Sequence, residues 1–224
     1  MERPAPDRCR IVLVLPEELS PSDAPAALRA AMMGGDIASL IVPVHGLGER
    51  AYSDHLKELA AIAQPEGIAV VAEHDVRLAS RLGLDGVHVS GDLDELGDVI
   101  ERVKGRMSVG AQGPRTRDRA MEMGELGPDY IMFGTLGGDT HEPPAPRNLD
   151  LAEWWASMIE IPSLVMAGTD LDGTVDCAET GAEFVGLSRA VFAEPGRARE
   201  MVARANQMLD ANALRFAPRR EGDR

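Results

Sequence analysis

The segment GLDGVHVS (residues 83–90) contains the pattern that decides the fold, because the same pattern occurs at three other places in the chain. In each copy a glycine is followed closely by Asp or Glu and then by a short apolar run, and a helical pattern precedes the glycine. Such a glycine is typical of a left-handed helix C-terminus, and the polar turn then leads into a buried strand. The other copies are GGDIASLIV (34–42), GPDYIMFG (127–134) and GAEFVGLS (181–188).

Four similar apolar runs lie between these copies, so the sequence predicts eight strands in all. The runs are rich in β-branched residues and show little polar alternation, which is typical of parallel strands buried on both faces. The predicted strands are 10–15, 37–42, 68–73, 86–90, 107–111, 129–134, 162–168 and 184–188.

Helical patterns occupy most of the intervals between the strands. Alternation of strands and helices over this length predicts an α/β fold, a single (β/α)8 TIM barrel. The alternative is an open, doubly wound sheet, but VLPEELSPSD (14–23) lacks the glycine-rich dinucleotide turn expected after its first strand. We expect one domain, residues 1–215, followed by a flexible polar tail, 216–224. The predicted helices are 23–33, 53–63, 93–104, 116–126, 151–160, 174–180 and 196–212.

The composition limits the classes of function. A chain of 224 residues, 44% of them hydrophobic, can bury a sizeable core. The formal net charge of −14 argues against a nucleic-acid partner, although a local pocket can still bind a small anion. Cys9 and Cys177 form no CxxC or metal-ligand spacing, so we expect reduced thiols in a cytoplasmic protein. The absence of a long apolar run predicts no membrane partner.

The last two predicted strands end in residues suited to an anion. In a TIM barrel the active site lies at the C-terminal ends of the strands, and phosphate is commonly held after strands seven and eight. Gly168 lets the backbone approach a ligand, and Arg189 can add a forked, charge-assisted contact. The alternative is that Gly168 is only a turn and Arg189 only a surface charge beside Glu194. The predicted phosphate-binding residues are Gly168, Thr169, Ser188 and Arg189.

Other strand ends carry polar residues that could take part in chemistry. Asp75 with Asp92 or Asp94 could hold Mg²⁺, which prefers one or two carboxylates plus substrate phosphates, although Asp92 and Asp94 could simply cap a helix. The segment 134–147 is the longest irregular stretch and is predicted to cover the substrate. Its candidate substrate contacts are Thr135, Thr140 and Arg147.

These segments resemble the thiamine phosphate synthase family, whose relatives include the thiazole tautomerases. The resemblance covers most of the chain, and its most specific parts are GLDGVHVSGDLDEL (83–96), PDYIMFGTLGGDT (128–140) and IPSLVMAGTD (161–170). It implies a barrel in thiamine biosynthesis that joins a hydroxymethylpyrimidine diphosphate to a thiazole phosphate, using Mg²⁺ and releasing pyrophosphate. The implied partner is a small phosphorylated heterocycle. For the oligomeric state, we also consider a homodimer.

Several positions depart from the family pattern on the side of the diphosphate. Leu93 stands where the second metal aspartate is expected, Gln112 replaces a serine, and Glu142 stands in the loop where a lysine is expected. No basic residue occurs in SLIVPVHG (39–46), where the family has a Gln-x-Arg pair. The thiazole-phosphate residues Gly168 and Ser188 are retained.

Three functions therefore remain open: a divergent synthase with a degenerate diphosphate half-site, a thiazole-phosphate tautomerase or isomerase, and a non-catalytic regulatory barrel that binds a phosphorylated metabolite. We favour the first. In the second, His74 or His141 would move the proton. In the first, Arg115 or Arg147 would replace the missing cations. The candidate catalytic residues are His74, Gln112, Arg115 and His141.

Overall fold

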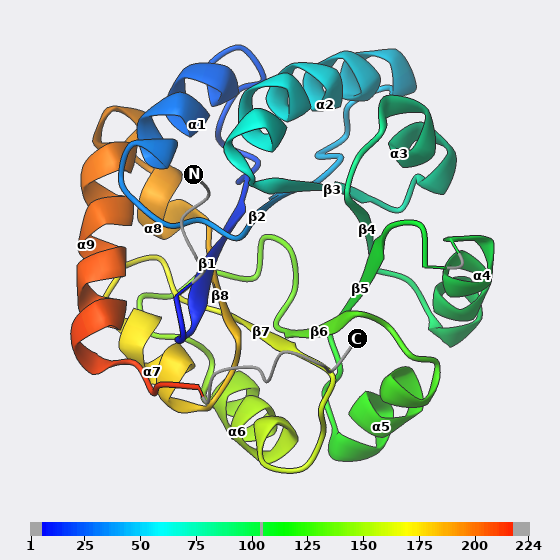
Figure 1. Ribbon diagram of the computed structural model, residues 1–224, viewed down its shortest axis with the longest axis vertical. Helices are drawn as coiled ribbons and strands as arrows, with labels where there is room; N and C mark the ends of the chain where they lie inside the picture. Colours follow the sequence, from blue (N-terminus) through cyan, green and yellow to red (C-terminus); the bar gives the residue numbers. More distant parts are fainter. Residues whose placement is uncertain (1–5, 104, 217–224) are drawn as a thin grey trace.

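The structure is a computed structural model that describes residues 6–103 and 105–216. Its centre is a closed barrel of parallel strands that pair in sequence order, β1 to β8, with β8 pairing back to β1 (Figure 1). This confirms the predicted TIM barrel and excludes the open sheet. The strands are β1 Arg10–Val14, β2 Ser39–Val42, β3 Ala69–Glu73, β4 Gly86–Val89, β5 Ser108–Gln112, β6 Tyr130–Phe133, β7 Ser163–Met166 and β8 Phe184–Leu187.

Helices surround the barrel and follow the strands in turn (Figure 1). Two of them, α3 and α8, were not predicted; α8 has only four residues, too few to show an apolar period. A second difference concerns α6, which begins with Pro146 in its first turn and ends at Ala156, so it starts and stops earlier than predicted. The helices are α1 Ala24–Met32, α2 Glu49–Ala63, α3 Val76–Leu82, α4 Leu93–Val103, α5 Arg117–Glu125, α6 Pro146–Ala156, α7 Gly173–Glu179, α8 Arg189–Phe192 and α9 Ala198–Asn212, with 3₁₀ turns at Gln64–Glu66 and Pro195–Arg197.

The acid in each of the four repeated turns has a common structural role. Each carboxylate lies before an even-numbered strand and bonds to a residue at the start of the preceding strand. In three of the four turns, this bond satisfies a backbone N–H group at the floor of the barrel. The pairs are Asp36 with the Arg10 guanidinium, and Asp85, Asp129 and Glu183 with the N–H groups of Val70, Val109 and Ser163.

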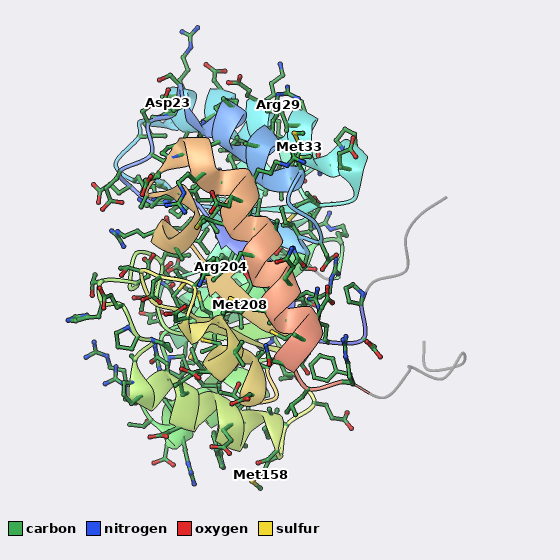
Figure 2. All side chains as sticks on the ribbon, turned by 90° about the vertical axis from the view of Figure 1, so that its left-hand side faces the viewer. Asp23, Arg29, Met33, Met158, Arg204 and Met208 are labelled. Carbon is green, nitrogen blue, oxygen red and sulfur yellow. The ribbon has the colours of Figure 1, made fainter. Side chains whose placement is uncertain are left out.

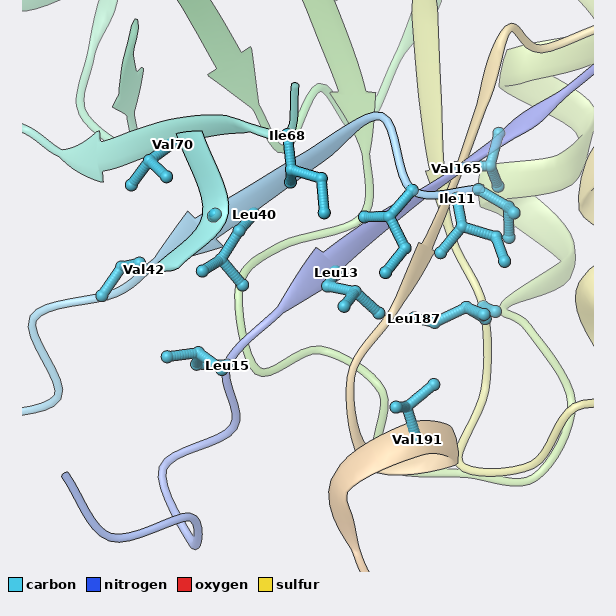
Figure 3. Packing of buried hydrophobic residues seen from close by; sticks show 14 of the residues in the cluster. Ile11, Leu13, Leu15, Leu40, Val42, Ile68, Val70, Val165, Leu187 and Val191 are labelled. Atoms are coloured by element: carbon cyan, nitrogen blue, oxygen red, sulfur yellow. The ribbon is translucent and has the colours of Figure 1, made fainter. Parts of the chain in front are cut away.

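The core has two parts, because successive side chains of a strand point to opposite faces. The outer part lies between the strands and the helices; Figure 3 shows Leu13 of β1 near Leu40 and Leu187 in this layer. The inner part fills the barrel itself. Its buried members are Val12, Val14, Ile41, Val71, Met132, Leu164 and Met166.

Helix α9 closes the outer ring against α1 and α7. Figure 2 shows this long helix running across the outside of the barrel, with Arg204 and Met208 on its surface. The chain segments at the two ends meet beside it, since Arg8 and Arg215 form an isolated antiparallel bridge. The predicted tail, 216–224, falls outside the described residues except for Phe216, whose N–H donates to the carbonyl of Asp7 over 2.6 Å.

The inner layer also contains glycines that make room for larger neighbours. A Cβ atom added to Gly110 in β5 would overlap the ring of Tyr130 on the adjacent strand. We expect Gly110→Ala to destabilise the fold by about 1–3 kcal/mol, the usual cost of overpacking. Urea unfolding should detect the loss. Gly97→Ala in α4 is the control, because its Cβ would meet only Leu126 at 3.9 Å and alanine favours a helix; equal losses in both variants would contradict the prediction.

Both cysteines are buried free thiols, as predicted. Burial raises the pKa of Cys9 to about 12 and also raises that of Cys177. Thiols held in this protonated state are poor nucleophiles, which fits a packing role.

Candidate functional site

A cavity of about 480 Å³ lies at the C-terminal ends of β5, β6 and β7. Most of its wall comes from the segment that follows β6, which in the view of Figure 1 extends within the ring of strands. Arg147 lies in the first turn of α6 rather than in the irregular loop where it was predicted. The cavity brings together five predicted site residues: Arg115, Thr135, His141, Arg147 and Gly168.

A second, smaller cavity of about 200 Å³ adjoins the first through Thr135 and Gly113, which line both. It lies at the ends of β4 and β5, and its wall includes Gln112 and Asp92. Arg119, in the first turn of α5, adds a cation to it. Together, the two cavities form a continuous surface at the mouth of the barrel, where a TIM barrel places its ligand site.

The predicted anion site is built around Arg189, and an internal carboxylate occupies its donors. The backbone N–H of Arg189 donates to Asp139 Oδ2 over 2.8 Å, and Arg189 Nη1 donates to Asp139 Oδ1 over 2.7 Å. Glu18 accepts from the other side of the guanidinium, so Arg189 does not pair with Glu194. The side chain of Asp139 has an exposed fraction of 0%. Burial raises its pKa, although the Arg189 donors oppose that rise.

The other members of the anion site are also covered. Thr169 N–H donates to the carbonyl of His141 over 2.8 Å, and a Cβ atom on Gly168 would overlap the carbonyl of Glu142. The hydroxyl of Ser188 is buried and has no hydrogen-bond partner among the described residues. The segment 139–142 therefore lies against Gly168, Thr169 and Arg189 of the predicted site.

The predicted metal residues are engaged at helix N-termini. Asp75 Oδ1 accepts from Leu78 N–H in α3, and Asp92 Oδ1 accepts from Glu95 N–H at the start of α4. Asp94 is exposed in the first turn of α4. In residues 6–103 and 105–216, no three Asp, Glu, His or Cys side chains converge as a metal ion requires.

His74 has a strained backbone and lies away from the two cavities. Its φ of 58° is in the left-handed region, which is uncommon for a residue with a side chain. Its Nδ1 lies 2.9 Å from Glu95 Oε1, and its ring lines neither cavity. His141, by contrast, lines the main cavity, with its Nδ1 3.0 Å from the Thr140 hydroxyl. Of the two predicted proton carriers, only His141 has access to a ligand there.

A buried network below the mouth orients Gln112. Its Oε1 accepts from Leu136 N–H over 2.8 Å, which fixes the orientation of the amide. The same oxygen lies 3.3 Å from His88 Nε2, so that nitrogen carries the ring proton and Nδ1 accepts from the Tyr130 hydroxyl. Burial lowers the pKa of His88 to about 4. Gln112 also lines the smaller cavity.

Asp139 and Arg119 belong to the site, but sequence reasoning missed both. Asp139 lies in Gly-Gly-Asp-Thr, and the two glycines before this acid were a signal in the sequence that the chain could turn back. In the structure Gly137 has a φ of 72°, which allows this turn. Arg119 lies one turn inside a predicted helix, where an arginine ordinarily faces solvent. Only the barrel geometry brings its side chain to the mouth.

These features define a class: (β/α)8 barrels whose arginine-containing cavity lies at the C-terminal mouth. The family model "Thiamine monophosphate synthase" matches residues 11–191, and the chain belongs to that family. The match begins in β1 and ends in α8, so it includes every strand of the barrel and both cavities.

Individual proteins agree with this assignment. The thiamine-phosphate synthase of Rhodospirillum centenum is 27% identical over 90% of this chain and 98% of its own length. That of Erythrobacter litoralis is 30% identical over 73% of this chain and 78% of its own length. Among solved structures, the thiamine phosphate pyrophosphorylase of Pyrococcus furiosus superposes with a TM-score of 0.76 at 17% identity, covering 92% of this chain and 97% of that one; this likeness concerns the fold alone.

Proposed function

We propose that the protein is a thiamine-phosphate-synthase-like transferase of thiamine biosynthesis, acting on small phosphorylated heterocycles. The observation that carries the proposal is the family match over residues 11–191, which includes the residues around both cavities at the mouth. The proposed reaction joins a hydroxymethylpyrimidine diphosphate to a thiazole phosphate. The C–O bond to the diphosphate breaks, pyrophosphate leaves with the electron pair, and the thiazole nitrogen bonds to the pyrimidine cation.

In this proposal the anion site and the two cavities bind different parts of the substrates. Gly168, Ser188 and Arg189 hold the monophosphate through N–H, hydroxyl and guanidinium donors. Arg115, Arg147 and Arg119 are the cations on the cavity walls that can face a departing pyrophosphate. Stabilising charge that develops in the transition state is usually the largest catalytic contribution. The chain therefore acts mainly by positioning the substrates and by placing cations.

Mg²⁺ is part of the proposal only as an ion that arrives with the diphosphate. Asp75 and Asp92 each use one carboxylate oxygen on a helix N-terminus, which leaves the second oxygen of each for a ligand. Two carboxylates plus substrate phosphates suit Mg²⁺. When bound, the ion would neutralise charge on the leaving pyrophosphate. Leu93 beside these acids supports a half-site that is degenerate for this purpose.

Tautomerisation or isomerisation of a thiazole phosphate is the second candidate, and His141 is the observation that favours it. Its ring lines the main cavity, and an imidazole can both accept and donate a proton near neutral pH. An assay of proton exchange on thiazole phosphate separates the two functions, because only the tautomerase requires His141. A protein that binds the phosphate but catalyses neither reaction would match the third hypothesis, a regulatory barrel.

Substitution of Gly168 tests the monophosphate site. A valine side chain would overlap the Glu142 carbonyl and the space beside the Gly168 N–H. We expect Gly168→Val to weaken the binding of thiazole phosphate by about 1–3 kcal/mol, the scale of lost charge-assisted hydrogen bonds. Calorimetry measures the change. Gly196→Ala is the control, since its Cβ would meet nothing within 4 Å; unchanged affinity in Gly168→Val would refute the site.

The setting of the protein is proposed from its charge, thiols and helices. Within residues 6–103 and 105–216, no helix combines the length and apolar character needed to cross a membrane. With a net charge of −14 and two reduced thiols, we propose a cytoplasmic protein that does not bind nucleic acid. A homodimer is the proposed assembly. Cell fractionation tests the location, a nucleic-acid binding assay at low salt tests the absence of binding, and sedimentation tests the homodimer.

A further inference from the structure

The Asp139 carboxylate occupies the donors that the proposed function assigns to a phosphate group. Its two oxygens take the backbone N–H and the guanidinium of Arg189, at 2.8 and 2.7 Å. Both are charge-assisted contacts of the kind that a phosphate oxygen makes. The carbonyls of Asp139 and Gly137 also lie at hydrogen-bond distance from Nη1, at 3.0 and 3.4 Å. Asp139 thus brings its whole loop segment to the anion site.

The neighbouring donors show that this occupation is incomplete. A carboxylate has two oxygens, whereas a phosphate monoester has three terminal oxygens. The buried Ser188 hydroxyl, adjacent to Arg189 in the chain, has no partner among the described residues. A buried hydroxyl without a partner costs about 1–3 kcal/mol. A third anionic oxygen would satisfy it.

We propose that Asp139 is an internal anion that competes with the phosphate of the substrate, and that the segment 137–142 must leave Arg189 before a phosphate group can bind. This inference rests on the proposed function, which takes Gly168, Ser188 and Arg189 as the phosphate site. Asp139 is a specificity-determining residue in this scheme: a ligand that lacks an anionic group cannot displace it.

The ion pair is suited to exchange rather than to permanent closure. Removing a carboxylate from water is costly, and a buried pair recovers that cost only in part. Burial raises the pKa of Asp139 despite its pairing with Arg189, which indicates a carboxylate that is not strongly stabilised. The exposed side of the guanidinium stays with Glu18, so Arg189 keeps its position when Asp139 departs.

The segment covers the rest of the site through backbone atoms. The His141 carbonyl accepts from Thr169 N–H over 2.8 Å, and the Glu142 carbonyl lies against Gly168. Displacement of Asp139 would release both contacts, because these residues are only two and three positions further along the chain. In the structure, Thr169 and Arg189 line a separate outer cavity of about 350 Å³. After the displacement, these two residues would form one side of the phosphate site.

The test compares the affinity for inorganic phosphate, and then for thiazole phosphate, in wild type, Asp139→Asn and Asp139→Ala by calorimetry. When only a fraction of the protein is in the binding-competent state, the apparent dissociation constant is the intrinsic dissociation constant divided by that fraction. We expect both variants to bind phosphate about ten-fold or more tightly than wild type. Asp150→Asn is the matched control: Asp150 is exposed on α6, so the same change in net charge should leave the affinity unchanged.

Each outcome decides the proposal. Tighter binding in both Asp139 variants, with Asp150→Asn unchanged, supports it. Equal, measurable binding in wild type and variants overturns it and leaves the proposed function intact. If no protein binds either phosphate compound, including Asp139→Ala, both the internal anion and the phosphate site of the proposed function are wrong.

A second measurement uses wild type and does not depend on how the variants fold. Hydrogen exchange is followed in peptides covering residues 135–145 at increasing phosphate concentration. Ligands usually slow exchange, but here phosphate should speed it in this segment, because Asp139 loses its contacts with Arg189. Exchange that slows or stays constant at saturating phosphate overturns the proposal.

Discussion

With hydroxymethylpyrimidine diphosphate, thiazole phosphate and Mg²⁺, the purified protein is expected to form thiamine phosphate at least about 10²-fold more slowly than a fully equipped synthase. Loss of one group that stabilises developing charge typically lowers the rate by about 10²–10³. Here Leu93 stands in place of a metal ligand, and Glu142 adds a negative charge where a lysine is expected. The closed contact between Asp139 and Arg189 lowers the population of competent protein further.

A coupled assay for pyrophosphate release measures this rate, with the Rhodospirillum centenum relative assayed in parallel. Glu142→Lys should raise the turnover, and Asp150→Lys on α6 is the control for a general change in charge. Wild-type turnover within the usual range of about 1–10³ s⁻¹ would show that the half-site is complete. Arg115, Arg119 and Arg147 would then be replaced first, because they line the cavities.

Acidification is expected to destabilise the protein through His88. Burial lowers the pKa of this histidine from 6.5 to about 4, so the unfolded chain binds its proton first as the pH falls. Stability is therefore complete above pH 6.5 and is lost between that value and about 4. A difference of this size corresponds to about 3 kcal/mol in total, of which about 2 kcal/mol is lost by about pH 5.

Urea unfolding at about pH 7.5 and about pH 5 measures the effect of acid on the free energy of unfolding. His88→Asn removes the titrating group, so its loss between the two pH values should be smaller than that of wild type by about 2 kcal/mol. His141→Gln is the control, since His141 is exposed. The buried ring of His55, whose pKa burial also lowers, contributes in the same direction and remains in both variants. An unchanged pH dependence in His88→Asn would contradict this account.

The barrel could be predicted because its strands are local and repeated. Each copy of the glycine–acid pattern marks a helix end and the next strand within a few residues, so no long-range information is needed. Helix α8 was missed because four residues cannot show an apolar period, and α3 was also missed, although α7, with the same length of seven residues, was predicted. The start of α6 was missed because Pro143, Pro144 and Pro146 indicate a loop, although Pro146 occupies the first turn, where the missing N–H does no harm.

The site was harder to predict, because its contacts join residues far apart in the chain. Arg189 and Ser188 were identified from local chemistry, but Asp139, the partner of Arg189, lies fifty positions away. The two glycines before Asp139 indicate a turn, but they do not tell which strand end the acid will reach. The helix-capping alternative for Asp92 was local and agrees with the structure.

The carboxylates at the barrel floor also set the phase of side-chain alternation along the even strands. In three of them the residue after the acid faces the barrel interior: Gly86 after Asp85, Tyr130 after Asp129 and Phe184 after Glu183. An insertion of one residue between Asp85 and His88 would either move the carboxylate away from Val70 or turn the histidine toward the helices. An insertion or deletion on the helix side of each acid would leave both the carboxylate contact and the phase of the strand unchanged.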